Sequence, residues 1–226
     1  MNIAAISDTH GIIKKDMIPE IQGSDILLIA GDTCDLYVQR NIEKSREWYK
    51  KFFIPWTQSL VVNHIVMIGG NHDFFLESEA DSFREMIDGT NITYLENEYL
   101  DIDGVTIYGT PLCHKFFNWA FMPSDEEQEK VFKETMDDRK IDILLSHDAP
   151  YGCSDICFES SYDNKSHIGN HVLRRMILDK KPALNIHGHL HSANHEEETL
   201  GDTKVYNVSL INENYALAYK PLVFQI

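Results

Sequence analysis

The chain has 226 residues, of which 43% are hydrophobic and 25% charged, the composition of a soluble globular protein whose core needs no disulfides. Acidic residues outnumber basic ones by 36 to 20, so the formal net charge is -16. This charge disfavours duplex nucleic acid as a partner, because proteins that bind duplexes usually present a basic face to the phosphates. We expect one domain over residues 1–226.

Short apolar runs alternate with helical patterns, which is typical of an α/β architecture. In chain order we predict a strand over 2–6, a strand over 25–30, a helix over 43–60, a strand over 65–68, a helix over 79–88, a strand over 105–109, a helix over 125–137, a strand over 141–146, a helix over 171–179 and a strand over 183–187. The third helix opens with Ser124-x-x-Glu127, a capping box. The remaining predicted strands, with no helix between them, cover 204–208, 215–220 and 222–225.

The amino terminus and the cysteines indicate the compartment. Residues 1–6 lead directly into Ser7-Asp8, without the basic stretch and apolar segment of a signal peptide. No apolar run approaches the roughly 20 residues that cross a membrane. The four cysteines form no Cys-x-x-Cys pair, and reduced thiols are the norm in the cytoplasm. We therefore expect a cytoplasmic protein with no membrane partner.

Five short motifs rich in metal-ligating residues follow one another, each just after a predicted strand. They are Asp8-Thr9-His10, Gly31-Asp32-Thr33-Cys34-Asp35, Gly70-Asn71-His72-Asp73, Ser146-His147 and Gly188-His189-Leu190-His191. Because ligands bind at the carboxyl ends of the strands in an α/β sheet, we expect the five loops to converge on one pocket. Their carboxylates, amide oxygen and imidazoles suit two divalent first-row metal ions side by side. The motifs indicate a two-metal hydrolase acting on phosphate esters.

The order of these motifs resembles that of the calcineurin-like metallophosphoesterase superfamily, whose pattern is D-x-H, G-D-x-x-D, G-N-H-D/E, H and G-H-x-H. The match extends from Asp8 to His191, which is most of the chain. It implies an α/β fold, a four-layer αββα sandwich of two mixed β-sheets with a dimetal site at one edge. The helix-poor carboxy-terminal third suits the second of these sheets.

The resemblance also implies a role for each motif residue. The first metal ion would be held by Asp8, His10, Asp32 and His191. The second would be held by Asn71, His147, His189 and the bridging carboxylate of Asp32. A metal-bridging hydroxide would attack phosphorus, with His72 as the general acid and Asp35 orienting the His72 imidazole. The ions would be manganese, iron or zinc, since such a ligand set accepts several metals.

The other histidines and the longest loop carry weaker signals. We expect surface or capping roles for the histidines that match no motif, which are His64, His114, His167, His171 and His195. His187 ends a predicted strand and is expected to be buried beside the site. Cys34 is expected to be an inert apolar residue. The polar segment Ala149–Gly169 follows directly on the His147 motif, so we expect a substrate-side loop there.

Two features favour a diester substrate. Tyr108-Gly109-Thr110-Pro111 and the Trp-Ala-Phe run at 119–121 resemble the metallophosphoesterase-domain-containing branch, whose members are similar to phosphodiesterases of modest activity. In phosphoprotein phosphatases of the superfamily an Arg-Gly continues the Gly-Asp motif and an Arg precedes Gly-Asn-His, whereas here those places hold Leu36-Tyr37 and Gly69. An arginine fork is the natural clamp for a phosphomonoester dianion. Its absence favours diesters or small nucleotides.

The function predicted from the sequence is a dinuclear-metal-dependent phosphoester hydrolase, more specifically a phosphodiesterase of small molecules or nucleotides. Two alternatives stay open. One is a phosphomonoesterase or nuclease on the same fold, although a nuclease would need a basic groove. The other is a metal-stabilised scaffold protein without significant turnover, although such scaffolds tend to lose the residues that are retained here. The sequence carries no signal for an oligomeric state.

Overall fold

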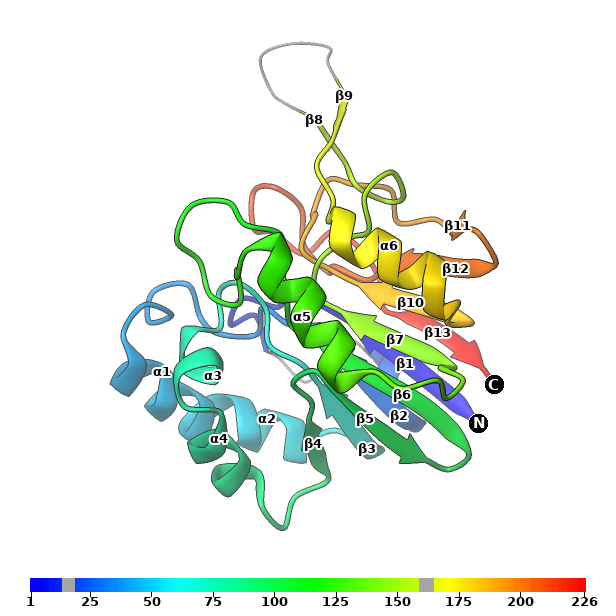
Figure 1. The fold of residues 1–226 in the computed structure, drawn as a ribbon. Coiled ribbons are helices and arrows are strands. Elements are labelled where there is room, and N and C mark those ends of the chain that lie inside the picture. The colour runs from blue at the N-terminus through cyan, green and yellow to red at the C-terminus, as the bar shows by residue number, and fades with distance from the viewer. Residues whose placement is uncertain (14–18, 159–164) are drawn as a thin grey trace.

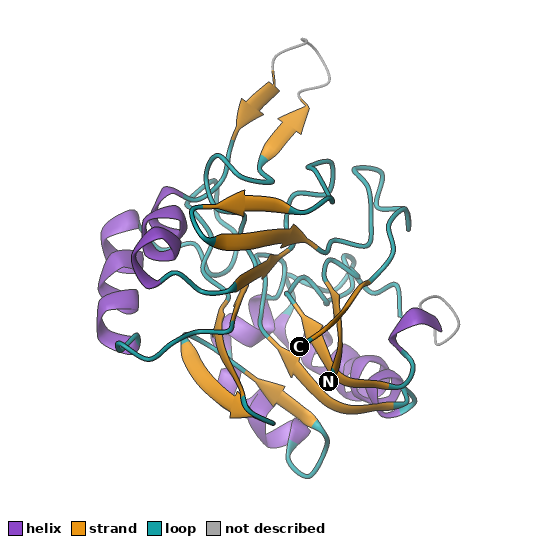
Figure 2. Ribbon diagram, turned by 90° about the vertical axis from the view of Figure 1, so that its right-hand side faces the viewer, coloured by secondary structure: helices purple, strands orange, loops and turns teal. Residues whose placement is uncertain are grey.

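The structure is a computed structural model that describes residues 1–13, 19–158 and 165–226. Two β-sheets lie face to face, and helices cover the outer face of each sheet (Figures 1 and 2). The arrangement is the four-layer αββα sandwich expected from the sequence. Both chain ends lie near each other at the same side of the molecule (Figure 1).

The first sheet has the strand order β13-β1-β2-β3-β4. Its members are β1 (Asn2–Ile6), β2 (Ser24–Ile29), β3 (Val62–Met67), β4 (Ile92–Tyr94) and β13 (Leu222–Gln225). Strands β1 to β4 run parallel, and β13 runs antiparallel to β1, with Asn2 opposite Gln225. The sheet is therefore mixed, and its parallel part aligns the carboxyl ends of β1, β2 and β3 at one edge.

The second sheet has the order β11-β12-β10-β7-β6-β5. Its members are β5 (Glu98–Ile102), β6 (Val105–Thr110), β7 (Ile143–Ser146), β10 (Leu184–His187), β11 (Glu198–Leu200) and β12 (Thr203–Asn207). The four inner strands are parallel, and the two edge strands are antiparallel to their neighbours. A separate hairpin of β8 (Ile156–Phe158) and β9 (Lys165–His167) projects from the body of the molecule (Figure 1).

Helices pack on the outer faces of the two sheets. Those on the first sheet are α1 (Ile42–Trp48), α2 (Ile54–Gln58), α3 (Phe74–Ser78) and α4 (Ala80–Ile87), with a short 3-10 helix at Pro19–Ile21. Those on the second sheet are α5 (Asp125–Thr135) and α6 (His171–Lys180). The capping box before α5 is confirmed, because Ser124 accepts from the Glu127 amide and the Glu127 side chain accepts from the Ser124 amide.

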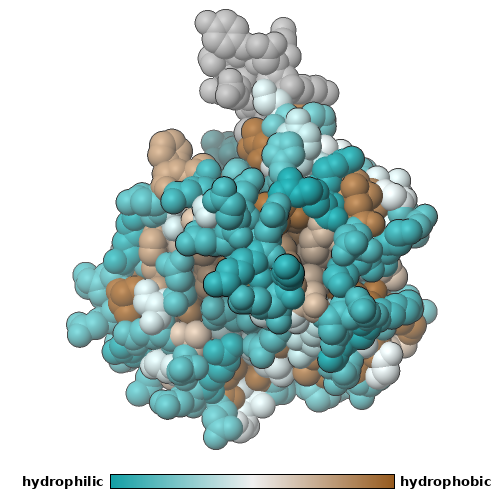
Figure 3. All heavy atoms as spheres, in the orientation of Figure 1, coloured by the Kyte–Doolittle hydropathy of each residue, from teal (hydrophilic) through white to brown (hydrophobic). Residues whose placement is uncertain are grey.

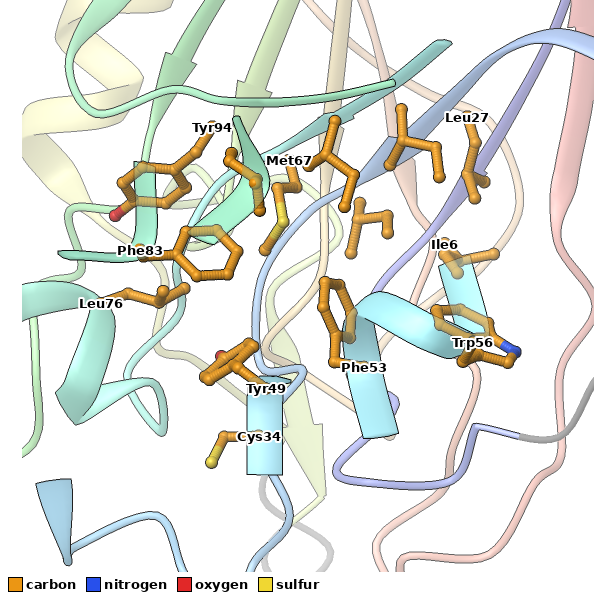
Figure 4. Packing of buried hydrophobic residues seen from close by; sticks show 14 of the residues in the cluster. Ile6, Leu27, Cys34, Tyr49, Phe53, Trp56, Met67, Leu76, Phe83 and Tyr94 are labelled. Atoms are coloured by element: carbon orange, nitrogen blue, oxygen red, sulfur yellow. The ribbon is translucent and has the colours of Figure 1, made fainter. Parts of the chain in front are cut away.

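Alternation along the strands produces three apolar layers. In β1, Ala4 and Ile6 face the helices of the first sheet, whereas Ile3 and Ala5 face the second sheet. The helix-side layer is rich in aromatic residues, among them Tyr49 and Phe53 (Figure 4). Cys34 packs into this layer as a small buried residue. A third layer lies between the second sheet and helices α5 and α6.

The structure differs from the predicted elements at particular places. The predicted helix over 43–60 is interrupted by a π-helical turn at Tyr49–Phe53, since Pro55 has no N–H to continue the regular ladder. Residues 215–220 do not form a strand, because a turn at Asn212 brings the amides of Ala218 and Tyr219 back to the Leu210 carbonyl. The assignment of the carboxy-terminal third to the second sheet holds for β11 and β12, but β13 belongs to the first.

The loop predicted at Ala149–Gly169 contains the β8–β9 hairpin, and residues 159–164 lie outside the described residues. Hydrophilic residues cover most of the face seen in Figure 3, with hydrophobic residues scattered among them. Among the described residues, no helix is long and apolar enough to span a bilayer.

Candidate metal centre

The five motifs predicted from the sequence come together at one edge of the sandwich. Three of them follow β1, β2 and β3 of the first sheet, and two follow β7 and β10 of the second. A backbone bond from the Ser7 amide to the Val208 carbonyl joins the edges of the two sheets beside Asp8. The site therefore lies where the carboxyl ends of parallel strands from both sheets meet, as expected for an α/β protein.

Asp8, His10 and His191 form the first group of candidate ligands. Their ligating atoms all lie within 4.8 Å of one another, and all three residues are buried. Nε2 of His191 is 3.3 Å from Oδ1 of Asp8, and Nε2 of His10 is 3.9 Å from the same oxygen. One carboxylate facing two imidazole nitrogens is a ligand set for a divalent transition metal ion.

A second group consists of Asp32, His147 and His189, whose ligating atoms also lie within 4.8 Å of one another. The Asn71 side-chain oxygen joins this group, 3.0 Å from Nε2 of His147. Oδ2 of Asp32 lies 3.4 Å from Nε2 of His147 and 3.6 Å from Nε2 of His10. Asp32 thus stands between the two groups, the place of a carboxylate that bridges two cations.

The protonation states of two candidate ligands, His10 and His189, fit metal binding. Burial lowers the pKa of His10 and of His189 to about 4, so both rings are neutral at pH 7, the form that binds metal. Both ring nitrogens of His10 are buried, and neither has a hydrogen-bond partner among the described residues, which is unusual for a side chain with no ligand to hold. Nδ1 of His147 donates to the Ala30 carbonyl at 2.7 Å and so directs Nε2 toward Asp32.

Asp32 and His147 form a tightly coupled pair. Burial opposes the charge on each group, but their mutual attraction outweighs it. The pKa of Asp32 therefore lies well below its usual value, and the pKa of His147 is raised to about 10. A cation entering this group would replace the proton of His147. The donor set, the partnerless nitrogens of His10 and the central carboxylate together fit a pair of divalent ions.

Four of the candidate ligands adopt left-handed backbone conformations. The φ angle is 55° at Asp8, 42° at His10, 52° at Asp32 and 69° at His189. Residues other than glycine rarely adopt this conformation, and each instance costs of order 1–3 kcal/mol. Such strain is typical of functional sites, where the loop geometry serves the direction of the side chain. The backbone conformation of these loops is therefore evidence of a functional site that does not depend on the chemistry of their side chains.

Two motif glycines are needed because the ligands crowd them. A Cβ atom at Gly70 would collide with Oδ1 of Asp32, and one at Gly188 would collide with Oδ2 of Asp8. In each case the obstacle is a buried carboxylate of the site. Glycine at these places allows the backbone to approach the ligand set closely.

Asp73 holds two of the motif loops together. Its buried carboxylate accepts from the Cys34 amide at 2.9 Å, from the Gly70 amide at 2.9 Å and from the Tyr49 hydroxyl at 2.8 Å. Burial, reinforced by the nearby charge of Asp32, raises the pKa of Asp73 to about 6. Through these contacts Asp73 ties its own loop to the loop of the Gly-Asp motif, and the sequence did not indicate Tyr49.

Asp73→Ala should lower the free energy of unfolding by about 3 kcal/mol, since it leaves several buried donors without an acceptor. Tyr49→Phe removes one hydrogen bond and should cost about 1 kcal/mol. Urea denaturation of both variants measures these effects, with the exposed Asp81→Ala as a control expected within about 0.5 kcal/mol of the wild type. If Asp73→Ala lowers the free energy of unfolding no more than Tyr49→Phe does, the buried Asp73 carboxylate does not hold the two motif loops together.

His72 forms a third candidate group with His10 and Asp32, whose ligating atoms also lie within 4.8 Å of one another. Nε2 of His72 is 3.9 Å from Oδ2 of Asp32, and the centroid of its ring lies 4.4 Å from that of Trp119, with the two rings tilted. Nδ1 of His72 contacts the side-chain oxygen of Gln39. The family resemblance implies that Asp35 makes this contact, but Asp35 accepts from the Tyr37 amide at 2.8 Å instead. Gln39 occupies the predicted position, and no sequence motif signals it because it lies outside the Gly-Asp motif.

A cavity of about 470 Å³ opens onto the ligand groups. Its walls include Asp32, Asn71, His72, His114, Phe116 and Trp119. Ile168, next to the β8–β9 hairpin, also borders the cavity, which places the end of the predicted Ala149–Gly169 loop beside the site. His114, for which the sequence predicts a surface or capping role, lines this cavity with a side chain that is 25% exposed.

The remaining histidines lie outside the ligand groups. His187 is fully buried, as expected. His167 pairs with Asp155 at 2.6 Å, and His171 stacks on Tyr151. His195 stacks on Tyr219, and His64 is exposed on β3. None of these five is among the candidate ligand groups found in the described residues.

An αββα sandwich with carboxylates and imidazoles at the shared carboxyl edge of its sheets is the architecture of metal-dependent phosphoester hydrolases. The chain belongs to the calcineurin-like phosphoesterase family, whose model matches residues 1–193. The resemblance recognised from the five motifs is therefore confirmed.

Individual relatives agree with this assignment. The chain is 28% identical over its whole length to the UPF0046 protein T07D4.2 of Caenorhabditis elegans, of which it spans 60%. It is 27% identical to the human metallophosphoesterase domain-containing protein 1, across 98% of this chain and 69% of the human protein. The human protein carries the name of the metallophosphoesterase-domain-containing branch, which residues 108–111 and 119–121 of this chain resemble.

Solved structures share the fold at low sequence identity. TT1561 of Thermus thermophilus superposes with a TM-score of 0.61 at 14% identity, covering 93% of this chain and 89% of that protein. The phosphopantetheinyl hydrolase PptH of Mycobacterium tuberculosis superposes with a TM-score of 0.57 at 13% identity, covering 95% and 90%. At these identities the likeness establishes the architecture alone.

Proposed function

We propose that this protein is a dinuclear-metal-dependent phosphodiesterase of small molecules or nucleotides. The observation that carries the proposal is the arrangement of buried carboxylates and imidazoles in candidate ligand groups that meet at Asp32, beside a cavity lined by the imidazole of His72. The proposal assigns no metal ion to His72. Asp8, His10 and His191 would hold one divalent ion, and Asp32 would be shared with the second group. Manganese, iron and zinc all suit these oxygen and nitrogen ligands.

The protein's own residues have defined tasks in this reaction. Two bound divalent ions would supply the Lewis acidity and the activated water that phosphoester hydrolysis requires. His72 would donate a proton from Nε2 to the leaving oxygen, while Gln39 holds the opposite edge of the ring. Burial lowers the pKa of His72 from its usual value, which makes its protonated form a stronger acid.

Charges around the cavity favour a diester. Among the described residues that line it there is no lysine or arginine, whereas the carboxylate of Glu213 is at its wall. A phosphodiester carries one negative charge and a phosphomonoester close to two, so the acidic wall opposes the monoester more strongly. The net charge of -16 supports a small substrate rather than a nucleic-acid duplex.

The proposal is tested by the hydrolysis of bis-p-nitrophenyl phosphate and p-nitrophenyl phosphate by metal-reconstituted protein. We expect kcat/KM for the diester to exceed that for the monoester by at least about tenfold, equivalent to about 1.4 kcal/mol. Chelation of the metal should abolish both activities.

Glu213→Gln removes the acidic wall and should raise the monoester activity relative to the diester activity. A preference of the wild type for the monoester would contradict the diester assignment, and absence of turnover with two ions bound would favour the scaffold alternative.

A further inference from the structure

A second imidazole, that of His114, is fixed at the wall of the same cavity. Its Nδ1 lies 2.9 Å from Oδ2 of Asp148, and the His114 backbone amide donates to the same oxygen at 2.7 Å. The other carboxylate oxygen of Asp148 accepts from the Ala149 amide at 2.9 Å. Because the Asp148 side chain is fully buried, the carboxylate has little freedom, and it determines the orientation of the imidazole ring.

This geometry leaves the far edge of the His114 ring for the cavity. Both the amide and Nδ1 are engaged by Asp148, whereas Nε2 lies on the opposite side of the ring, and a quarter of the side chain is exposed. The ring lies 6.2 Å from that of His189, a candidate ligand of the second group. His72, by contrast, lies 4.8 Å from the ring of His10 in the first group. The imidazoles of His114 and His72, to which the proposed function assigns no metal ion, thus lie on two sides of the site, His114 near His189 and His72 near His10.

The charged oxygens of a bound substrate would face the wall of this cavity. A bound phosphodiester has two non-bridging oxygens that carry its negative charge, and no lysine or arginine stands among the described residues of the cavity wall to contact them. A carboxylate that accepts from one ring nitrogen of an imidazole fixes the orientation of the ring, and many functional sites use this pairing to direct the other nitrogen. Burial lowers the pKa of His114, but the bond and charge of Asp148 outweigh burial and raise it above the usual value.

The geometry points to His114 as a substrate-contacting residue, whose Nε2–H donates to a non-bridging oxygen of the phosphoester while Asp148 positions the ring. The inference rests on the proposed phosphodiesterase function and adds to it the residue that takes the place of the missing arginine clamp. His114 acts on the phosphoryl group itself, and its contribution is therefore independent of the leaving group. His72 acts on the leaving oxygen, and its contribution depends on how readily that oxygen leaves.

His114→Ala separates contact with the substrate from support of the loop, because the bond from the residue-114 amide to Asp148 does not need the side chain. We expect kcat/KM for bis-p-nitrophenyl phosphate to fall about 10- to 100-fold, with metal content unchanged. Diphenyl phosphate, which has a poorer leaving group, should lose the same factor. His114→Gln keeps a donor on a side chain of similar reach and should recover part of the loss. His64→Ala, which removes an exposed histidine outside the cavity, is the matched control and should behave as the wild type.

Two results would overturn the inference. One is an unchanged kcat/KM in His114→Ala. The other is a clearly larger loss on diphenyl phosphate than on bis-p-nitrophenyl phosphate, the pattern expected of His72→Ala, which would assign His114 to the leaving oxygen.

Should the wild type hydrolyse neither diester, the proposed function fails and the contact is decided by the binding of inorganic phosphate to the metal-loaded protein, measured by calorimetry. About tenfold weaker binding in His114→Ala supports the contact. Equal binding in the wild type and the variant refutes it.

Discussion

Asp32→Ala is expected to remove both metal binding at the second ligand group and hydrolysis. Oδ2 of Asp32 lies 3.6 Å from Nε2 of His10 and 3.4 Å from Nε2 of His147, so its loss deprives both groups of an oxygen at once. We expect kcat to fall by at least about 10³-fold, the scale of removing a central catalytic group. Mass spectrometry of bound metal and the rate of diester hydrolysis measure the two effects on the same sample.

Two further variants show whether a loss of metal or activity in Asp32→Ala comes from misfolding. Asp32→Asn keeps the shape of the side chain but cannot serve as a charged bridge, so it should also lose metal. Asp81→Ala, at an exposed position on α4, should retain two ions and full activity. A folded Asp32→Asn protein with wild-type turnover would show that Asp32 does not join the two ligand groups.

His72→Ala should give the opposite combination, in which metal is retained and turnover is lost. The residues that would ligate the ions are unaltered, but the proton donor for the leaving oxygen is gone. A general acid contributes roughly 10²- to 10⁴-fold, and we expect a loss in kcat within that range. The loss should be larger for diphenyl phosphate than for bis-p-nitrophenyl phosphate, because the poorer leaving group depends more on protonation.

Gln39→Ala completes this comparison. Gln39 contacts Nδ1 of His72 and only orients the ring. Its removal should therefore lower kcat by about tenfold, the lower end of the range for a supporting residue. A His72→Ala variant that loses its metal, or one that keeps full kcat on both diesters, would contradict the role of His72 as the general acid.

The fold was predictable wherever its signal was local. Strands β1, β2 and β10 are short apolar runs between polar or glycine residues, and the capping box before α5 is a pattern of four residues. Strands β4 and β5 were missed, since β4 has three residues and β5 is only partly buried. The pairing of β13 with β1 joins the two ends of the chain, and no local pattern reveals such a partner.

In the candidate site, the residues within the motifs were predictable from the sequence and those outside the motifs were not. The motif residues lie at strand ends, so topology alone brings Asp8, Asp32 and His147 together. Gln39, Tyr49 and His114 lie outside the motifs, and each reaches the site through a side-chain contact with a residue far away in sequence. Such contacts depend on how the loops fold over one another. They became visible only once the packing of the loops was known.

The most direct test of the two-metal account is a titration of metal-stripped protein with Mn²⁺, with the hydrolysis of bis-p-nitrophenyl phosphate followed at each addition. The account predicts that activity rises until two ions are bound per chain and then stays constant, because the two ligand groups share Asp32 and act on one substrate. Full activity at one ion per chain, or activity that is independent of added metal, would contradict it.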